Sequence, residues 1–409
     1  MTTLVNSLPT RTASNPGTFN AVYQSGEQNT LTNDQITTAR NKYWPPRIGD
    51  GSSWEEVLPV TVMAYACYTP SNTTLTFYYD NLKNTRPGTT YDLPEEGYLP
   101  EWNSTGATKV VINSSFAGAR PTTTFAWFYN MSGLTSILGM NYLNTSEVTD
   151  MSSMFQGCSG LTSLDLSSFN TSKVTTMESM FWACDGLTSL NLNGFNTSKV
   201  TTMQGMFCYC SSLTNLDLSS FNTSMVTKMS NMFTGCSNLT ELDLGRFNTS
   251  KVTSMSSMFS SCSKLTELDL SSFNTSKVAD MGQMFVLCDN LTTIYVGSGW
   301  TTAAVAASNY MFYNCTKIRG EKGTTYNANH LDAAYAHIDG GTSNPGYLSS
   351  AVRPGDVNGD GQVNITDVTV LINIVLTDST PTAGADVNGD GNVNITDVTT
   401  LITMVMSGT

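Results

Sequence analysis

Two twelve-residue segments near the carboxyl end carry the residue types that bind a hard metal ion. Residues 356–367 read Asp-Val-Asn-Gly-Asp-Gly-Gln-Val-Asn-Ile-Thr-Asp, and residues 386–397 differ from them at one position in twelve. A calcium ion takes about six to eight oxygen ligands, and a loop of this length supplies them from positions 1, 3, 5, 7, 9 and 12, with glycine at position 6 for the sharp turn. The spacing therefore predicts two calcium ions, one in each loop.

The predicted ligands are carboxylate, amide and carbonyl oxygens. In the first loop they are Asp356, Asn358, Asp360, the carbonyl of Gln362, Asn364 and Asp367, with Gly361 at the turn. In the second loop they are Asp386, Asn388, Asp390, the carbonyl of Asn392, Asn394 and Asp397, with Gly391 at the turn. Apolar residues at helical spacing predict one helix after each loop. Because three carboxylates converge in each loop, we expect poor order without metal.

A cysteine-marked repeat fills the centre of the chain. Six cysteines recur at one constant spacing, namely Cys158, Cys184, Cys210, Cys236, Cys262 and Cys288. A unit of about 26 residues cannot bury its own apolar face, so it becomes stable by stacking on its neighbours. We therefore predict an α/β repeat solenoid. Such a fold presents an elongated surface instead of a closed pocket, which favours recognition over catalysis.

Each repeat has two halves with different periodicity. Leu161, Leu164 and Leu166 fit a short strand, and equivalent strands should form one parallel sheet. The second half is predicted to be a short helix capped by Thr171 or Ser172. Its apolar residues in this repeat are Val174, Met177, Met180, Phe181 and Cys184.

Two features of the repeat allow two interpretations each. Cysteines in an extracellular chain suggest disulfides, but equivalent positions of stacked repeats point in parallel, which favours buried free thiols. Asn-Thr-Ser triplets at Asn170 and its equivalents satisfy the glycosylation sequon. Their fixed place in the period favours a structural asparagine that bonds to backbone at the turn.

The outward strand positions form the candidate ligand face. Its column consists of Asp165, Asn191, Asp217, Asp243, Asp269 and Tyr295, with Glu241 and Glu267 in the column beside it. Like charges on neighbouring strands repel. The column therefore indicates either a bound cation or basic ligand, or charges that water screens.

The predicted domains follow from these patterns. Residues 1–50 are the end of a preceding repeat region or a linker, and residues 51–133 form an N-terminal β cap. The repeats occupy residues 134–318, a closing segment and linker residues 319–351, and the loop-helix pair residues 352–409.

Composition and charge exclude several classes of partner. Only 12% of the residues are charged, and the net charge is −13. This charge repels nucleic acid and anionic membrane surfaces. No apolar run is long enough to span a bilayer. The first residues lack the features of a signal peptide, so we expect that the natural amino terminus of a secreted protein precedes this chain.

The repeat resembles the BspA-like leucine-rich repeats of bacterial surface proteins, in their M-F-x-x-C-x-x-L-T-x-L-D-L-S-x-F-N-T-S-x-V variety. Residues 75–81 are similar to that family's N-terminal hairpin, and residues 327–330 and 338–341 to its closing segment. The resemblance implies a leucine-rich-repeat arc in a secreted or surface-exposed protein that serves adhesion and recognition of an extracellular protein or glycan.

Residues 354–406 resemble a type I dockerin, a small α domain with two loops like those of EF-hands. The resemblance implies calcium-dependent folding and docking onto a cohesin-like module. Loop positions 10 and 11 help to choose the partner in that family, and here they are Ile365-Thr366 and Ile395-Thr396. The near-identity of the two units implies that the domain can bind in two orientations.

Together these patterns predict a non-enzymatic recognition protein at the bacterial cell surface. Two alternatives stay open: a dockerin-tethered hydrolase of polysaccharide or peptide, and a structural stalk that binds nothing. A hydrolase needs a paired acid and base, and the chain has two histidines, His330 and His337. No Gly-x-Ser-x-Gly or His-Glu-x-x-His motif occurs in the chain.

Overall fold

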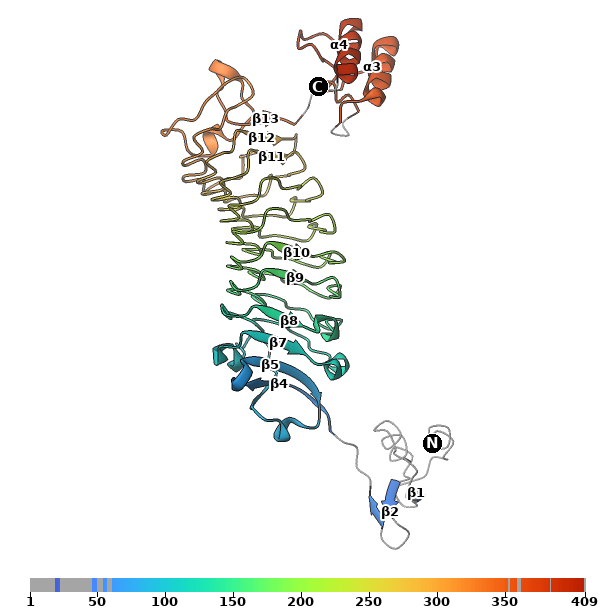
Figure 1. Cartoon of the computed structure of the whole chain (residues 1–409). Coiled ribbons are helices and arrows are strands. Elements are labelled where there is room, and N and C mark those ends of the chain that lie inside the picture. The colour runs from blue at the N-terminus through green and yellow to red at the C-terminus, as the bar shows by residue number, and fades with distance from the viewer. Residues whose placement is uncertain are drawn as a thin grey trace.

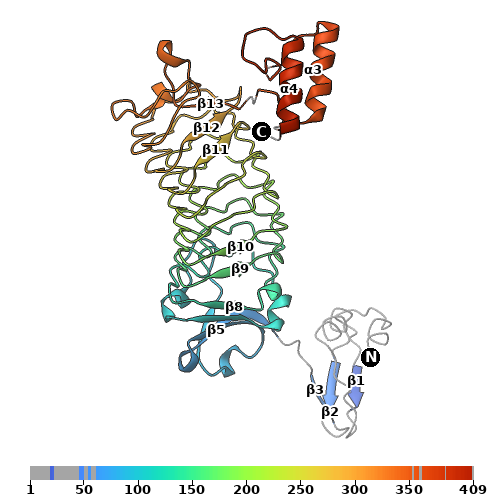
Figure 2. The ribbon, with the colours of Figure 1, turned by 45° about the horizontal axis from the view of Figure 1, so that its top comes forward.

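The structure is a computed structural model of the chain. It describes strands β1 (Phe19–Val22), β2 (Pro46–Gly49) and β3 (Trp54–Glu56), and residues 61–351, 354–358, 362–382 and 384–407. Most of the predicted domain 1–50 lies outside the described residues. The described elements are small sheets, turns and two α-helices, with no closed barrel among them. Figures 1 and 2 show the segments from β4 to β13 as successive rungs of a stack.

Two sheets precede the repeats. Strands β1, β2 and β3 form the first. The second has the order β6-β4-β5-β7-β8, with β4 antiparallel to its neighbours and β5, β7 and β8 parallel. Pairing thus changes from a hairpin to the parallel register of the repeats. The bounds are β4 Met63–Thr69, β5 Thr74–Asp80, β6 Thr89–Asp92, β7 Lys109–Ile112 and β8 Ser136–Leu138.

Consecutive repeats are joined at equivalent positions. Parallel bridges run from Thr123 to Asp150 and Thr176 and onward, one repeat at a time, to Ala307. On the strand side, β9 (Ser163–Asp165) pairs with β10 (Ser189–Asn191). A further parallel sheet contains β11 (Glu267–Leu270), β12 (Thr293–Val296) and β13 (Ser349–Ser350). The period of the sequence is therefore the period of the stack.

The helix predicted for the second half of each repeat is wrong. Residues 174–184 form turns, in which Ser179 and Ala183 have φ values of 56° and 55°. Their backbone groups bond sideways to the next repeat, as from Ser179 N to Gln204 O at 2.8 Å and from Phe181 N to Met206 O at 2.9 Å. Because the next repeat takes up alternate N–H groups that a helix would bond internally, the segment forms separate turns and no α-helix. The apolar spacing marks the inward positions of a coil.

The single parallel sheet predicted along the array is also wrong, because it is interrupted. Residues 214–218 and 240–244, which lie between β10 and β11 in sequence, carry no strand. Acidic side chains such as Asp217 and Asp243 stand at equivalent positions there, and like charges on neighbouring strands repel. The continuous connection between repeats lies in the bridges from Thr123 to Ala307.

The cysteines form a ladder of buried free thiols. All nine are free and buried, which confirms this interpretation over disulfides. In the ladder a thiol donates to a phenylalanine carbonyl of the preceding repeat, as from Cys184 Sγ to Phe155 O and from Cys236 Sγ to Phe207 O, both at 3.1 Å. Burial raises the pKa of Cys184 to about 12. The thiolate that oxidation requires is thereby suppressed.

A buried threonine ties each repeat to the next. Thr223 Oγ1 donates to Asn248 O at 3.0 Å and accepts from Asn248 N at 2.7 Å. Thr171, predicted as a helix cap, makes the same two bonds with Asn196. The Asn248 side chain accepts from Ser250 N at 3.1 Å, which confirms the structural interpretation of the triplet. Asn248 is exposed, and these contacts do not test the alternative interpretation, glycosylation.

The closing segment covers the last repeat. Tyr347 is buried and packs edge-on against Phe312, with ring centroids 5.2 Å apart. Asp339 is also buried and accepts from the backbone N–H groups of Lys322, Thr324 and Gly341 at 2.9–3.0 Å. Burial by itself raises the pKa of Asp339, but these and further hydrogen bonds outweigh it and hold the pKa well below its usual range. The segment is thus fixed by an ionised carboxylate.

Helices α3 (Ile365–Thr377) and α4 (Ile395–Ser407) have a core of their own. Its buried members are Val357, Val368, Leu371, Ile374, Ala385, Val387, Val398 and Leu401, and they form a cluster separate from that of the repeats. Among the described residues, no helix has the length and apolar content needed to cross a membrane.

Replacing Thr223 by valine should destabilise the stack, because Asn248 N and O would lose a buried partner. We expect a loss of about 2 to 4 kcal/mol in the free energy of unfolding, measured by urea denaturation. Thr223→Ser keeps the hydroxyl and should retain most of the stability. Equal stability of the valine and serine variants would contradict the role of the hydroxyl.

Candidate functional site

The second predicted calcium loop is turned as such a loop requires. Asp386 accepts from Asp390 N at 3.1 Å and from Gly391 N at 2.8 Å. Asn388 Oδ1 accepts from Asp390 N at 2.9 Å, and Asp390 Oδ1 accepts from Asn392 N at 2.8 Å. Gly391 has a φ of 85°, in the left-handed region that favours glycine. The side-chain oxygens at positions 1, 3 and 5 are therefore turned inward over the loop backbone.

The last aspartate of each loop closes it. Asp397 is buried, and its Oδ1 accepts from Val387 N at 2.9 Å and Asn388 N at 3.1 Å, while its Oδ2 accepts from Asn394 N at 2.9 Å. Asp367 makes the same three bonds in the first loop. A carboxylate has about four lone-pair sites, so these three bonds leave about one site for a metal. Each aspartate thus joins the start of its loop to the following helix.

The asparagines at the ninth loop position cap the helices. Asn364 Oδ1 accepts from Thr366 N, and Asn394 Oδ1 accepts from Thr396 N, both at 2.8 Å. Of the other predicted ligands in the first loop, Asp356 is buried. Asp360 and Gly361 lie outside the described residues.

The predicted ligands fit calcium by their chemistry. All of them are oxygens, which suits a hard cation, with no thiolate or imidazole that would favour a softer metal. Within the described parts of the chain, no three acidic, histidine or cysteine side chains come together as a metal cluster. The turn of the second loop and the caps of both helices are in place, and the carboxylates of Asp367, Asp386, Asp390 and Asp397 accept hydrogen bonds from backbone N–H groups.

The predicted partner-binding residues stand at the start of the helices. Ile365 is 66% exposed and Ile395 63% exposed. Thr366 Oγ1 and Thr396 Oγ1 each accept from a loop amide, Asn358 Nδ2 and Asn388 Nδ2 respectively, at 3.0 Å. The isoleucines thus face outward, and the threonines connect loop to helix.

Further apolar side chains extend this exposed surface, and they were not predicted from the sequence to be partner-binding residues. They are Ile372 and Leu376 on α3 and their equivalents Ile402 and Met406 on α4. Each set follows its first isoleucine by seven and eleven residues, so it shares one helix face with it. This spacing is the feature of the sequence from which the exposed apolar face could have been predicted. The two helices thus carry equivalent apolar faces.

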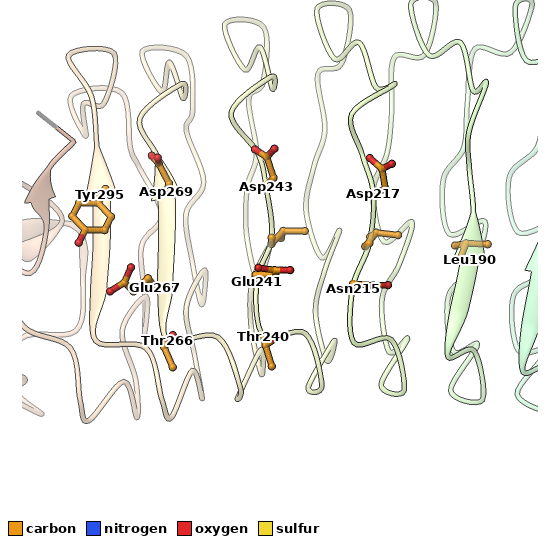
Figure 3. Close-up of a pocket in the computed structure, with 12 residues that line it drawn as sticks. Leu190, Asn215, Asp217, Thr240, Glu241, Asp243, Thr266, Glu267, Asp269 and Tyr295 are labelled. Carbon is orange, nitrogen blue, oxygen red and sulfur yellow. The ribbon is translucent and has the colours of Figure 1, made fainter. Parts of the chain in front are cut away.

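The candidate ligand face is a groove along the strand side. The groove has a volume of about 880 Å³, and Asp217, Asp243, Asp269 and Tyr295 line it. Figure 3 shows these aspartates in a row, with Glu241 and Glu267 beside them. Asp165 lines a separate hollow of about 350 Å³, and Asn191 lines neither. The structure thus brings four members of the predicted column together. Leu190, Asn215, Thr240 and Thr266 are lining residues that sequence reasoning missed.

The aspartates of this column also have a local structural role. Asp217, Asp243 and Asp269 each accept from the backbone N–H two residues later, at 2.8–2.9 Å. The hydroxyl and N–H of Ser219 lower the pKa of Asp217. The backbone N–H of Ser167, with smaller contributions from other hydrogen bonds, lowers the pKa of Asp165. These two carboxyl groups therefore stay ionised in ordinary buffers.

Comparison with known proteins identifies both parts of the chain. Residues 354–406 match the dockerin type I domain. Residues 123–239 and 209–326 match a family described as Mycoplasma protein of unknown function, DUF285. Neither the curated proteins nor the solved structures contained a match. The chain therefore combines a DUF285 repeat region with a type I dockerin domain at its C-terminal end.

Proposed function

We propose that this chain is an extracellular recognition protein of the bacterial cell surface. Its repeats present a binding face, and its dockerin attaches it to a cohesin-type partner in a calcium-dependent way. The observation that carries the proposal is the pair of near-identical loops, each leading into a helix with an exposed apolar face. Dockerin domains imply attachment of an extracellular protein to a cohesin.

The repeats are proposed to be a BspA-like leucine-rich-repeat solenoid. Support comes from the equivalent leucines, from the parallel bridges between repeats and from the match to DUF285. A stack of this kind offers a long open face instead of an enclosed cavity. Such a face suits a protein or glycan that covers several repeats.

Two calcium ions are proposed, one for each loop. Asp356, Asn358, Asn364 and Asp367 would hold the first together with Asp360 and the Gln362 carbonyl. Asp386, Asn388, Asp390, Asn394, Asp397 and the Asn392 carbonyl would hold the second. Calcium would neutralise the carboxylates that each loop concentrates. This would stabilise both helices, because each begins beside its loop.

A hydrolase is a less favoured interpretation of this chain than a binding protein. A glycosidase needs one carboxyl group whose pKa is raised. Hydrogen bonds instead lower the pKa of Asp165 and of Asp217. His330 stacks on Tyr335 with centroids 4.3 Å apart, and His337 Nδ1 contacts Ile338 O at 2.9 Å. Neither histidine lines the strand groove. We therefore propose binding without turnover.

Removing calcium should unfold the dockerin helices. Because α3 and α4 are the α-helices of the described residues, circular dichroism at 222 nm of the full chain reports on them. The signal should fall in EDTA and recover with CaCl₂, and calorimetry should count two ions. Asp397→Ala should weaken one site about tenfold or more, because it removes a charged ligand. The exposed Asp185→Asn is the control. An unchanged signal in EDTA would contradict the proposal.

Cohesin binding should survive the loss of either apolar helix face but not of both. Ile365→Asp or Ile395→Asp alone should change affinity by roughly twofold, because one of two equivalent orientations remains. The double variant should lose at least about a hundredfold, since a buried unpaired charge then stands in each face. Biolayer interferometry against a panel of cohesin modules measures this, with the exposed Leu138→Asp as control. Loss of binding in one single variant would show that only one face is used.

The acidic strand groove should bind basic extracellular proteins. Asp217→Asn/Asp243→Asn/Asp269→Asn keeps the local acceptor oxygens, as Asn191 does naturally with Asn193 N. The triple variant should lose about tenfold or more in affinity at low salt, and the difference should shrink in 1 M salt, where the Debye length is about 3 Å. An array of extracellular-matrix proteins provides the ligands. Asp92→Asn/Asp185→Asn/Asp289→Asn removes equal charge elsewhere, and an equal loss in this variant would reject the groove.

A further inference from the structure

The turns of the repeats hold two columns of residues with left-handed backbone. Small residues or asparagine fill most of the first column, namely Ser153, Ser179, Gly205, Asn231 and Ser257, with φ of 54–61°. They also fill most of the second, namely Gly157, Ala183, Gly235, Ser261 and Asn314, with φ of 55–76°. Left-handed backbone suits glycine and asparagine and disfavours large side chains. The repeats therefore ordinarily keep these turn columns small.

Four large residues break this rule, and three of them gather at one end. Gln283 and Tyr310 stand in the first turn column with φ of 59° and 58°, and Tyr209 and Leu287 in the second with φ of 58° and 59°. The other repeats show that the fold does not need large side chains here. A strained position that persists is evidence of a function for the side chain.

A hollow lies beside two of these residues, Gln283 and Tyr310. Gln283, Val286, Tyr310 and Tyr313 line it, and its volume is about 370 Å³, within the usual range for small-molecule sites. The two tyrosine rings stand at 84° with centroids 5.9 Å apart. Tyr310 is 58% exposed and Tyr313 45% exposed. The hollow thus presents two differently oriented ring faces without any charged lining residue.

A second aromatic pair lies along the same turns. Trp182 and Tyr209 have ring centroids 6.2 Å apart. A Cβ added to Gly205 would stand 2.6 Å from the Trp182 ring, and one added to Gly235 would stand 2.5 Å from the Tyr209 ring. The rings therefore rest on the glycines of the following repeats, which fixes their orientation before any ligand arrives.

Backbone hydrogen bonds connect the two aromatic pairs in one line. Tyr209 N bonds to Thr234 O, Gly235 N to Ser260 O, Ser261 N to Val286 O and Leu287 N to Tyr313 O, at 2.6–2.9 Å. These four repeat steps correspond to roughly 19 Å at about 4.8 Å per step. The residues Gly235, Ser260 and Ser261, which lie on this line between the pairs, have side chains too small to project far from the surface. The arrangement suits an extended polymer better than a compact ligand.

We propose that this turn surface binds a neutral polysaccharide, with its main contact at Tyr310 and Tyr313 and a second at Trp182 and Tyr209. Sugar C–H groups carry partial positive charge and pack on the negative face of an aromatic ring. Within the described residues, the phenol hydroxyls of Tyr310 and Tyr313 and the side-chain amide of Gln283 make no hydrogen bond, so they are available to sugar hydroxyls. An uncharged lining gives no advantage to an anionic chain. The site shares no residue with the strand groove.

Calorimetry of the full chain with cellohexaose, xylohexaose and mannohexaose tests the proposal, with hexagalacturonate as the charged comparison. At least one neutral hexasaccharide should bind, and more tightly than hexagalacturonate. Tyr313→Ala and Tyr310→Asn should each weaken binding about tenfold. Tyr98→Ala, at an exposed tyrosine of the N-terminal cap, should leave the affinity within about twofold.

Tyr310→Asn separates a ligand role from a structural one. Asparagine tolerates left-handed backbone better than tyrosine, so the melting temperature should stay equal or rise while binding falls. A lower melting temperature with unchanged binding would assign Tyr310 to the fold and overturn the proposal. Failure of every neutral hexasaccharide to bind, or tighter binding of hexagalacturonate, would also overturn it. Cohesin and strand-groove binding are measured separately and are unaffected by either result.

Discussion

Backbone hydrogen bonding between neighbouring repeats is the constraint on which the structure depends. A coil of turns satisfies only part of its own N–H and C=O groups, and a buried backbone group without a partner is costly. Each coil therefore uses the next one, through backbone bonds such as Phe181 N to Met206 O and through the hydroxyl of Thr223. No repeat is stable by itself, so the ends of the stack need covers. Strands β4 to β7 and the segment around Asp339 supply them.

The same constraint arranges the surface chemistry in lines. Because equivalent residues stack in register, a change at one position of the repeat becomes a column along the molecule. On the strand side this produces the row of aspartates, each of which also accepts a hydrogen bond from the backbone N–H two residues later. On the turn side it produces columns of small residues, against which Tyr209 and Tyr310 stand out. Departures from the repeat are therefore more informative about binding than the repeat itself.

The dockerin domain is organised by a different requirement. Its small core is separate from that of the repeats. Its loops concentrate carboxylates, whose mutual repulsion a bound cation would relieve. Asp367 and Asp397 connect each loop to its helix, so the metal binding proposed for the loops would also stabilise the helices. The duplication of loop and helix places two equivalent apolar faces on one small domain. The proposed attachment and the proposed recognition thus occupy different modules of the chain.

The sequence by itself determined the period of the repeat, the buried residues and the oxygen-rich loops, because these depend on residue type and spacing alone. The free thiols also followed, since equivalent positions of stacked units point in parallel. Only the tertiary structure decided that residues 174–184 are turns, because bonds to a neighbouring repeat replace those within a helix and leave the same apolar spacing. It also decided that Asp165 lies apart from Asp217 and that Tyr310 meets Tyr313 beside Gln283. Such groupings depend on how adjacent coils stack, which no single repeat specifies.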